Sequence, residues 1–326
     1  MNLRKMSIRS LGRKLSLLLL FMAVCISAGF MRAETAYAKT YKIKTANDWK
    51  NIAKKKGGTF KLTKNIKLKR KQYLTISKNK KYVIDLNGHT VTDNGTGSTA
   101  CPLAVKKGTV TLKSSKKGKG VLYSKEWMAV TVTGNAKFYL KSGAIVNDTA
   151  EFRTGLASGI YVGNSASCFV QGGTIRSVNN GIAVADSGKL YVTGTPRICA
   201  GYLNTSMNFT HYGSGIYIQS ASCKLVLQGG SIGTMSNPDT VTQGAMGSII
   251  IYTGSGHYPV LDRSGKVLAK TPGYKFVDAG GNERPVYPSN LALMYPQMAG
   301  LFPGESKLET WTKDAEGYYT IYVIPG

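Results

Sequence analysis

The sequence predicts an all-β fold, a right-handed parallel β-helix in which short strands stack in successive coils. One strand pattern is repeated four times, beginning at Val130, Ile160, Ile182 and Ile216. The step from the first strand to the second is 8, 8, 8 and 9 residues, and the step to a third inward residue is 7, 7, 8 and 7. One coil, from Ile160 to Ile182, takes 22 residues. Three short strands at a fixed short period are typical of a solenoid.

Each strand alternates apolar and polar residues, which directs one side inward and the other to water. The second-strand residues that we expect to stack in the interior are Phe138, Cys168, Leu190 and Leu225. The third-strand residues are Ile145, Ile175, Ile198 and Ile232. Small residues at the corners, such as Gly172 and Gly173, supply the backbone angles that a recurring bend needs.

Both ends of the repeat carry a different pattern. A capping-type start at Thr45 predicts a short amphipathic helix over residues 45–56 that covers the open end of the solenoid. Short strands follow at 59–62, 74–76 and 82–86. From about Gly256 the pattern stops, and seven of the ten prolines lie at Pro259 or later. We expect a β-helix with its N-terminal cap at 39–255, and either a C-terminal β cap or a small β module at 256–326, with a hairpin at 260–268 and a last strand at 318–323.

Residues 1–38 have the organisation of a secretory signal peptide. A basic start precedes an apolar stretch from Leu15 to Phe30 and a small-x-small site at Ala36 and Ala38. A transmembrane anchor is the competing interpretation, which the short apolar core disfavours. We therefore expect a secreted protein, extracellular or associated with the cell wall, with no transmembrane anchor after cleavage.

The chain is strongly basic, with a formal net charge of +27, and +22 remains after residues 1–38 because 37 basic residues then face 15 acids. Residues 39–81 hold sixteen Lys or Arg and a single acid, Asp48. Such a field attracts extracellular polysaccharide, anionic wall polymer or other polyanions over about a Debye length. The alternative is a solvated surface that favours solubility. No specific nucleic-acid motif is present.

Four cysteines remain after residue 38: Cys101, Cys168, Cys199 and Cys223. Cys168 falls at an inward position, where a small buried apolar residue is expected. A disulfide between coils is an open alternative. No zinc-type spacing occurs, so we expect no metal site.

The run from Ile84 to Val91, with the corners at 140–145 and 170–175, resembles the pectin-lyase-like right-handed β-helix superfamily. It is similar to secreted β-helix proteins of Gram-positive bacteria that bind carbohydrate at the cell surface. The resemblance covers roughly residues 45–251 and implies carbohydrate handling by analogy.

Catalysis has little support in the sequence. The adjacent aspartates of hydrolases are missing, since residues 94–256 hold only Glu126, Asp148, Glu151, Asp186 and Asp239. A lyase would neutralise a uronate with Ca²⁺ and use a basic side chain. Asp148, Glu151 and Arg153 are a sparse set for calcium, which takes six to eight oxygen ligands. We expect no cofactor, and Ca²⁺ only if the protein is a lyase.

Two corners are expanded, at 146–159 and 199–215, while the corner at 176–181 between them is short. Coils in register place these corners along one edge, where aromatic rings, amides and charges suit a sugar chain. The residues of this predicted ridge are Asp148, Glu151, Phe152, Arg153, Arg176, Asn179, Tyr202, Asn208, Phe209, His211 and Tyr212. The alternative is that these corners are loops packed on the coil below.

The function predicted from the sequence is a non-catalytic surface protein that binds polysaccharide or another extracellular polyanion. The alternative is a polysaccharide lyase acting on a uronic-acid polymer at the ridge, with Arg153, Arg176 or His211 as catalytic candidates. His89 beside Asp85 is interpreted as part of an Asn-Gly turn rather than as a proton-transfer pair.

Overall fold

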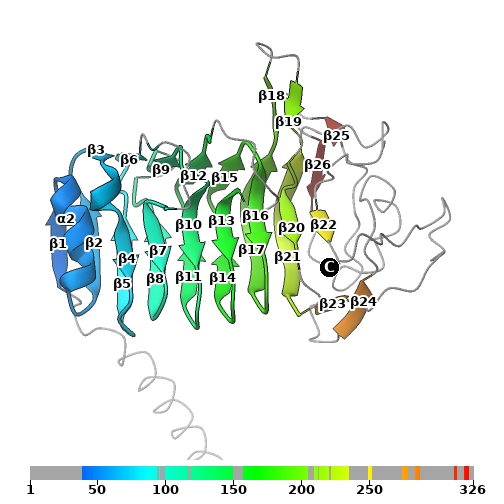
Figure 1. The fold of residues 1–326 in the computed structure, drawn as a ribbon, viewed down its shortest axis with the longest axis horizontal. Coiled ribbons are helices and arrows are strands. Elements are labelled where there is room, and N and C mark those ends of the chain that lie inside the picture. The colour runs from blue at the N-terminus through cyan, green and yellow to red at the C-terminus, as the bar shows by residue number, and fades with distance from the viewer. Residues whose placement is uncertain are drawn as a thin grey trace, which may run out of the picture. The chain divides into compact units, whose positions relative to one another are not determined.

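The described residues from Thr40 onward form stacked coils of short parallel strands, with a short helix in the first coil and a 3₁₀ turn, η2 (Arg70–Gln72), in the next (Figure 1). The computed structural model describes residues 39–93, 95, 100–116, 119–149, 157–204, 209–211, 213–219, 222–234, 249–251, 274–277, 283–286, 312–313 and 319–322. The expected signal peptide lies outside these residues. The predicted all-β parallel β-helix is confirmed.

Each coil contributes a strand to three faces of the solenoid, and two of these faces join into one sheet. The first face holds β1 (Thr40–Ile43), β2 (Gly58–Leu62), β5 (Lys81–Asp85), β8 (Thr109–Lys113), β11 (Lys137–Leu140), β14 (Ser167–Val170) and the first parts of β17 (Lys189–Ala200) and β21 (Lys224–Thr234). The second face holds β3 (Ile66–Leu68), β6 (Thr90–Asp93), β9 (Val121–Ser124), β12 (Ala144–Asn147), β15 (Thr174–Ser177) and the remainder of β17 and β21. The third face is a separate sheet of β4 (Leu74–Ile76), β7 (Leu103–Val105), β10 (Met128–Val132), β13 (Ser158–Val162), β16 (Asn180–Val184), β20 (Ile216–Ile218) and β22 (Ile249–Ile251).

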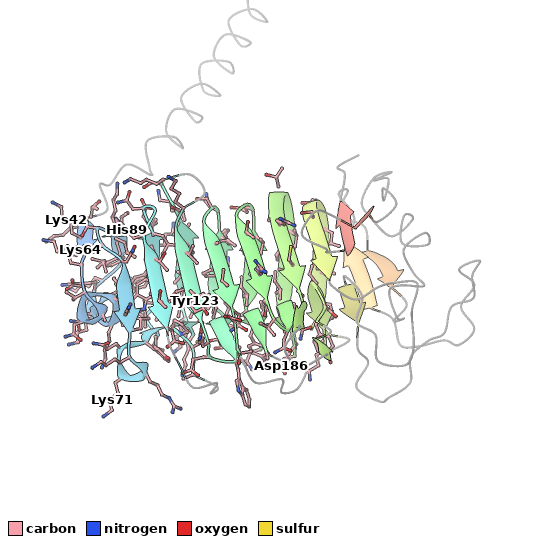
Figure 2. All side chains as sticks on the ribbon, turned by 90° about the horizontal axis from the view of Figure 1, so that it is seen from above. Lys42, Lys64, Lys71, His89, Tyr123 and Asp186 are labelled. Atoms are coloured by element: carbon pink, nitrogen blue, oxygen red, sulfur yellow. The ribbon has the colours of Figure 1, made fainter. Side chains whose placement is uncertain are left out.

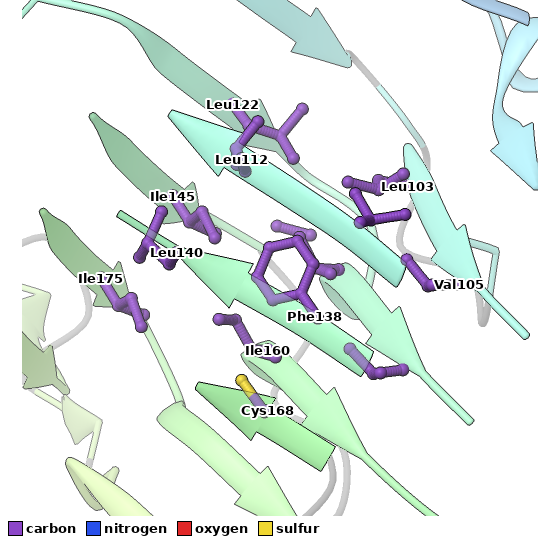
Figure 3. Close-up of a cluster of buried hydrophobic side chains, with 14 of the residues drawn as sticks. Leu103, Val105, Leu112, Leu122, Phe138, Leu140, Ile145, Ile160, Cys168 and Ile175 are labelled. Atoms are coloured by element: carbon purple, nitrogen blue, oxygen red, sulfur yellow. The ribbon is translucent and has the colours of Figure 1, made fainter. Parts of the chain in front are cut away.

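The strands stack in the register that the repeat predicts. Ile160 pairs with Val130 and Ile182, and Cys168 pairs with Phe138 and Leu190. The third column runs Ile145, Ile175, Ile198 and Ile232. These side chains are buried in one continuous core, shown in part in Figure 3. The inward residues thus form columns along the solenoid axis, because every coil repeats the same path.

Glycine recurs at the corner between the first and second faces. Gly143 and Gly173 occupy equivalent places there with φ angles of 88° and 81°. A Cβ on Gly173 would lie 2.5 Å from the carbonyl oxygen of Gly143 in the coil below. The stacked corners leave no room for a side chain, as the sequence predicted.

The N-terminal helix forms as predicted and covers the first coils. α2 (Ala46–Asn51) continues into a 3₁₀ turn, η1 (Ile52–Lys54), and Thr45 and Asp48 form a reciprocal capping box at its start. Trp49 is fully buried, and its Nε1 donates to the Pro102 carbonyl oxygen at 3.1 Å. The strand that precedes the helix, β1, was not predicted.

The described C-terminal strands are β23 (Tyr274–Val277), β24 (Glu283–Val286), β25 (Thr312–Lys313) and β26 (Tyr319–Tyr322). β26 pairs antiparallel with β21, from Ser231 with Tyr322 to Thr234 with Tyr319. It occupies part of the edge that the last coil would otherwise expose. The last strand was predicted, whereas the hairpin expected at 260–268 lies outside the described residues.

Replacing Phe138 with alanine should destabilise the solenoid by about 3–5 kcal/mol, because the ring is fully buried and its loss leaves a cavity between coils. Urea unfolding followed by circular dichroism measures the change. Thr111→Ala, on the outer side of β8, is the matched control and should cost far less. A loss of similar size in both variants would contradict the assigned register.

Candidate functional site

The outer side of the first face carries a column of lysine and hydroxyl residues, one from each coil. In register it runs Lys81, Thr109, Lys137, Ser167, Lys189 and Lys224. No carboxylate stands in this column, and Lys189 lies directly opposite Lys224. Like charges facing each other across neighbouring strands are destabilising. The arrangement therefore favours an anionic partner.

A stack of aromatic rings runs beside this column. Tyr139, Phe169 and Tyr191 lie two positions further along the same strands. The Tyr139 and Phe169 rings are 4.4 Å apart between centroids and 7° from parallel, and the Phe169 and Tyr191 rings are 4.7 Å and 8°. Because the rings face one another, they present their edges to solvent as a flat apolar strip.

Further lysines surround the first coils. Lys42, Lys64 and Lys71 project outward at the N-terminal end of the solenoid (Figure 2). Lys113 and Lys141 lie at the other margin of the first face, beyond the aromatic stack. Two acids on these coils are engaged locally: Asp48 accepts from the Lys44 and Thr45 amides, and Asp85 from the Asn87 and Ser115 amides. The basic charge of residues 39–81 is thus displayed on the surface.

The predicted ridge is present in part, as a groove of about 320 Å³ on the second face and its corner. Asp148 and Arg176 come from neighbouring coils and both line this groove, with Gly201 of the next coil. The Asp148 Oδ2 accepts from the Tyr123 hydroxyl at 2.7 Å. Burial and this hydrogen bond raise the Tyr123 pKa, so the phenol keeps its proton. The groove is therefore lined by one acidic and one basic residue from neighbouring coils.

The other residues of the ridge divide into three groups. Asn179 is buried, and within the described structure its Nδ2 has no hydrogen-bond partner. The corner at 199–215 was expected as an expanded loop, but β18 (Tyr202–Asn204) and β19 (Phe209–His211) form an antiparallel hairpin that pairs Tyr202 with His211. Outside the described residues lie Glu151, Phe152, Arg153, Asn208 and Tyr212.

Sequence reasoning missed a pair of buried carboxyls. Asp93 and Glu126 come from adjacent coils, and the Tyr73 hydroxyl donates to Asp93 and lies 2.8 Å from the Glu126 Oε1. Ser124 donates to Asp93 at 3.1 Å. Asp93 and Glu126 are 1% and 0% exposed. This burial suits carboxyls that join neighbouring coils by hydrogen bonds rather than carboxyls that react with a polymer on the surface.

The remaining candidates have structural roles. Asn87 and Gly88 adopt positive φ angles of 50° and 79°, which confirms the Asn-Gly turn before His89. All four described cysteines are buried, and none of them is in a disulfide. Cys168 lies in the core, where burial raises the pKa of its thiol.

Within the described part of the chain, no group of three or more His, Cys, Asp or Glu residues could hold a metal ion. Nor do those residues include a helix long and apolar enough to cross a membrane. No protein-family model matches the chain, and no match was found among curated proteins or solved structures.

Asp93→Asn should change how stability depends on pH. Burial raises the pKa of Asp93, with the nearby Glu126 adding to the effect. The unfolded chain loses this proton near about pH 3.9 and the folded protein only at higher pH, so stability falls as pH rises between the two values. Asp93→Asn removes this contribution.

Urea unfolding between about pH 4 and pH 8 measures this dependence. The unfolding free energy of wild type minus that of Asp93→Asn should decrease as pH rises. Asp186→Asn, which replaces an exposed carboxyl, is the control and should not reproduce the trend. A pH-independent difference for Asp93→Asn would contradict the prediction.

Proposed function

We propose that this protein is an extracellular, non-catalytic binding protein for polysaccharide or another polyanion of the cell surface. The observation that carries the proposal is the first face, where a lysine column without a carboxylate runs beside an apolar aromatic stack. Lysine is a compact point charge without the forked geometry of arginine, so such a face attracts anionic polymers broadly. The basic residues at 39–81 extend the attraction.

The parallel β-helix suits this function because it is rigid and extended along one axis. Neighbouring strands are about 4.8 Å apart, so side chains on successive coils form a regular row. A linear polymer lying along the axis contacts several coils at once, and each contact adds to the affinity without a deep pocket. The expected secretory leader at residues 1–38 supports an extracellular place for this binding.

Binding should depend on salt and on the lysine column. Lys189→Gln with Lys224→Gln should lower the affinity for a carboxylated polysaccharide about tenfold at low salt, because two surface charges contribute up to about 1 kcal/mol each. Isothermal titration calorimetry at several salt concentrations measures this effect. Lys50→Gln with Lys71→Gln removes the same charge from exposed sites away from the first face and should weaken binding less. Equal losses in both double variants would indicate a solvated basic surface without a site.

The groove at Asp148 and Arg176 supports a second candidate function, a polysaccharide lyase, because a guanidinium and a carboxylate line one groove there. Incubation with uronic-acid polymers, with and without Ca²⁺, tests this candidate through the ultraviolet absorbance of unsaturated products. Under the binding proposal no product forms. Product that disappears in Arg176→Ala would replace the binding proposal with the lyase.

A further inference from the structure

From Lys81 to Lys189 the lysine column of the first face alternates between charged and neutral residues, and it then ends with two lysines in register, Lys189 and Lys224. Lys81, Lys137 and Lys189 belong to every second coil, and the coils between them place Thr109 and Ser167 in the same column. Strands of neighbouring coils are about 4.8 Å apart, so the charges of this row recur at about 9.6 Å. A hydroxyl group lies midway between successive charges.

The aromatic stack lies beside the middle of this row. Tyr139, Phe169 and Tyr191 share their strands with Lys137, Ser167 and Lys189, respectively. The site is thus three coils long and has a charged row along one side. Its other margin is polar but less charged, with Lys141 and Gln171 following β11 and β14. These six side chains, Lys137, Tyr139, Ser167, Phe169, Lys189 and Tyr191, are called the alternating strip.

We propose that the alternating strip binds a linear polysaccharide that carries one acidic group on every second sugar and lies along the solenoid axis. This inference rests on the proposed polyanion binding and specifies its ligand. A pyranose ring in an extended chain advances the polymer by about 4.8 Å, the separation of neighbouring coils, so one sugar meets each coil. Acidic sugars then meet Lys137 and Lys189, and the neutral sugar between them meets the Ser167 hydroxyl.

The chemistry of each row matches one side of such a chain. Because the stacked rings cover one another's faces, the sugars contact the ring edges through dispersion, while the Tyr139 and Tyr191 hydroxyls can hydrogen-bond to sugar hydroxyls. A polymer with an acid on every sugar would place a carboxylate opposite Ser167, without a cation there. The strip therefore favours alternating over uniform charge.

A charge-conserving exchange tests the spacing. Lys137→Thr with Thr109→Lys moves one lysine by one coil and keeps the net charge and both residue types on the outer side of the sheet. The ligands are a hyaluronan oligosaccharide, with acids on alternate sugars, and an oligogalacturonate of equal length, with an acid on every sugar. We expect the exchange to weaken hyaluronan binding about fivefold and to leave oligogalacturonate binding nearly unchanged.

A second variant keeps the test independent of the exchange. Ser167→Lys fills the neutral place in the row, and Gln171→Lys adds the same charge on the same coil outside it. Ser167→Lys should raise oligogalacturonate affinity about fivefold and hyaluronan affinity less, whereas Gln171→Lys should raise both to a similar extent. Circular dichroism confirms that each variant is folded.

The outcomes separate the two proposals. Wild-type binding that the exchange leaves unchanged for both oligosaccharides would overturn the alternating strip while the general polyanion binding stands. Binding of polyphosphate but of neither oligosaccharide would overturn the alternating strip as a polysaccharide site, while the general polyanion binding stands. If wild type binds no polyanion at low salt, both proposals fail.

Discussion

The in-register stacking of coils is the interaction on which the rest of this structure depends. A single coil cannot bury its inner side chains or pair its strand edges, so each coil is stable only through its neighbours. Stacking joins the aliphatic residues into continuous columns, such as Ile145, Ile175, Ile198 and Ile232. It also favours glycine at corners where the backbones of neighbouring coils lie too close for a Cβ atom. The same coil-to-coil repeat applies to the outward-facing residues. They therefore also form rows along the axis, although core packing does not depend on them.

Much of the fold could be predicted because the core repeats at a fixed period. The spacing of Val130, Ile160 and Ile182 was enough to set the register of three coils, which the strand pairing confirms. The hairpin of β18 and β19 could not be predicted, since an expanded corner is free of the repeat. β1 was also missed, because its basic, alternating residues resemble the surrounding polar segment.

The candidate site was harder to predict, because its residues are far apart in sequence and follow no motif. Asp93 and Glu126 are one coil apart in sequence and are linked by hydrogen bonds to Tyr73 and Ser124, so a search for neighbouring acids misses them. Asp148 and Arg176 were predicted to meet, and both line one groove, since their corners are in register. The lysine column becomes visible only when the outer residues, and not the inner ones, are aligned by coil.

Charge and packing play separate roles in this solenoid. Buried polar residues at the corners bond between coils: Ser124 donates to Asp93, Asn147 to the Glu126 carbonyl oxygen, and Ser177 to Asn147. On the first face, the register instead places Lys189 beside Lys224, and this pairing of like charges opposes stacking. A bound anion would convert this repulsion into attraction shared by two coils. Like charges in register that weaken the free protein are where a binding function is best sought, and Lys189 and Lys224 on the first face are such a pair.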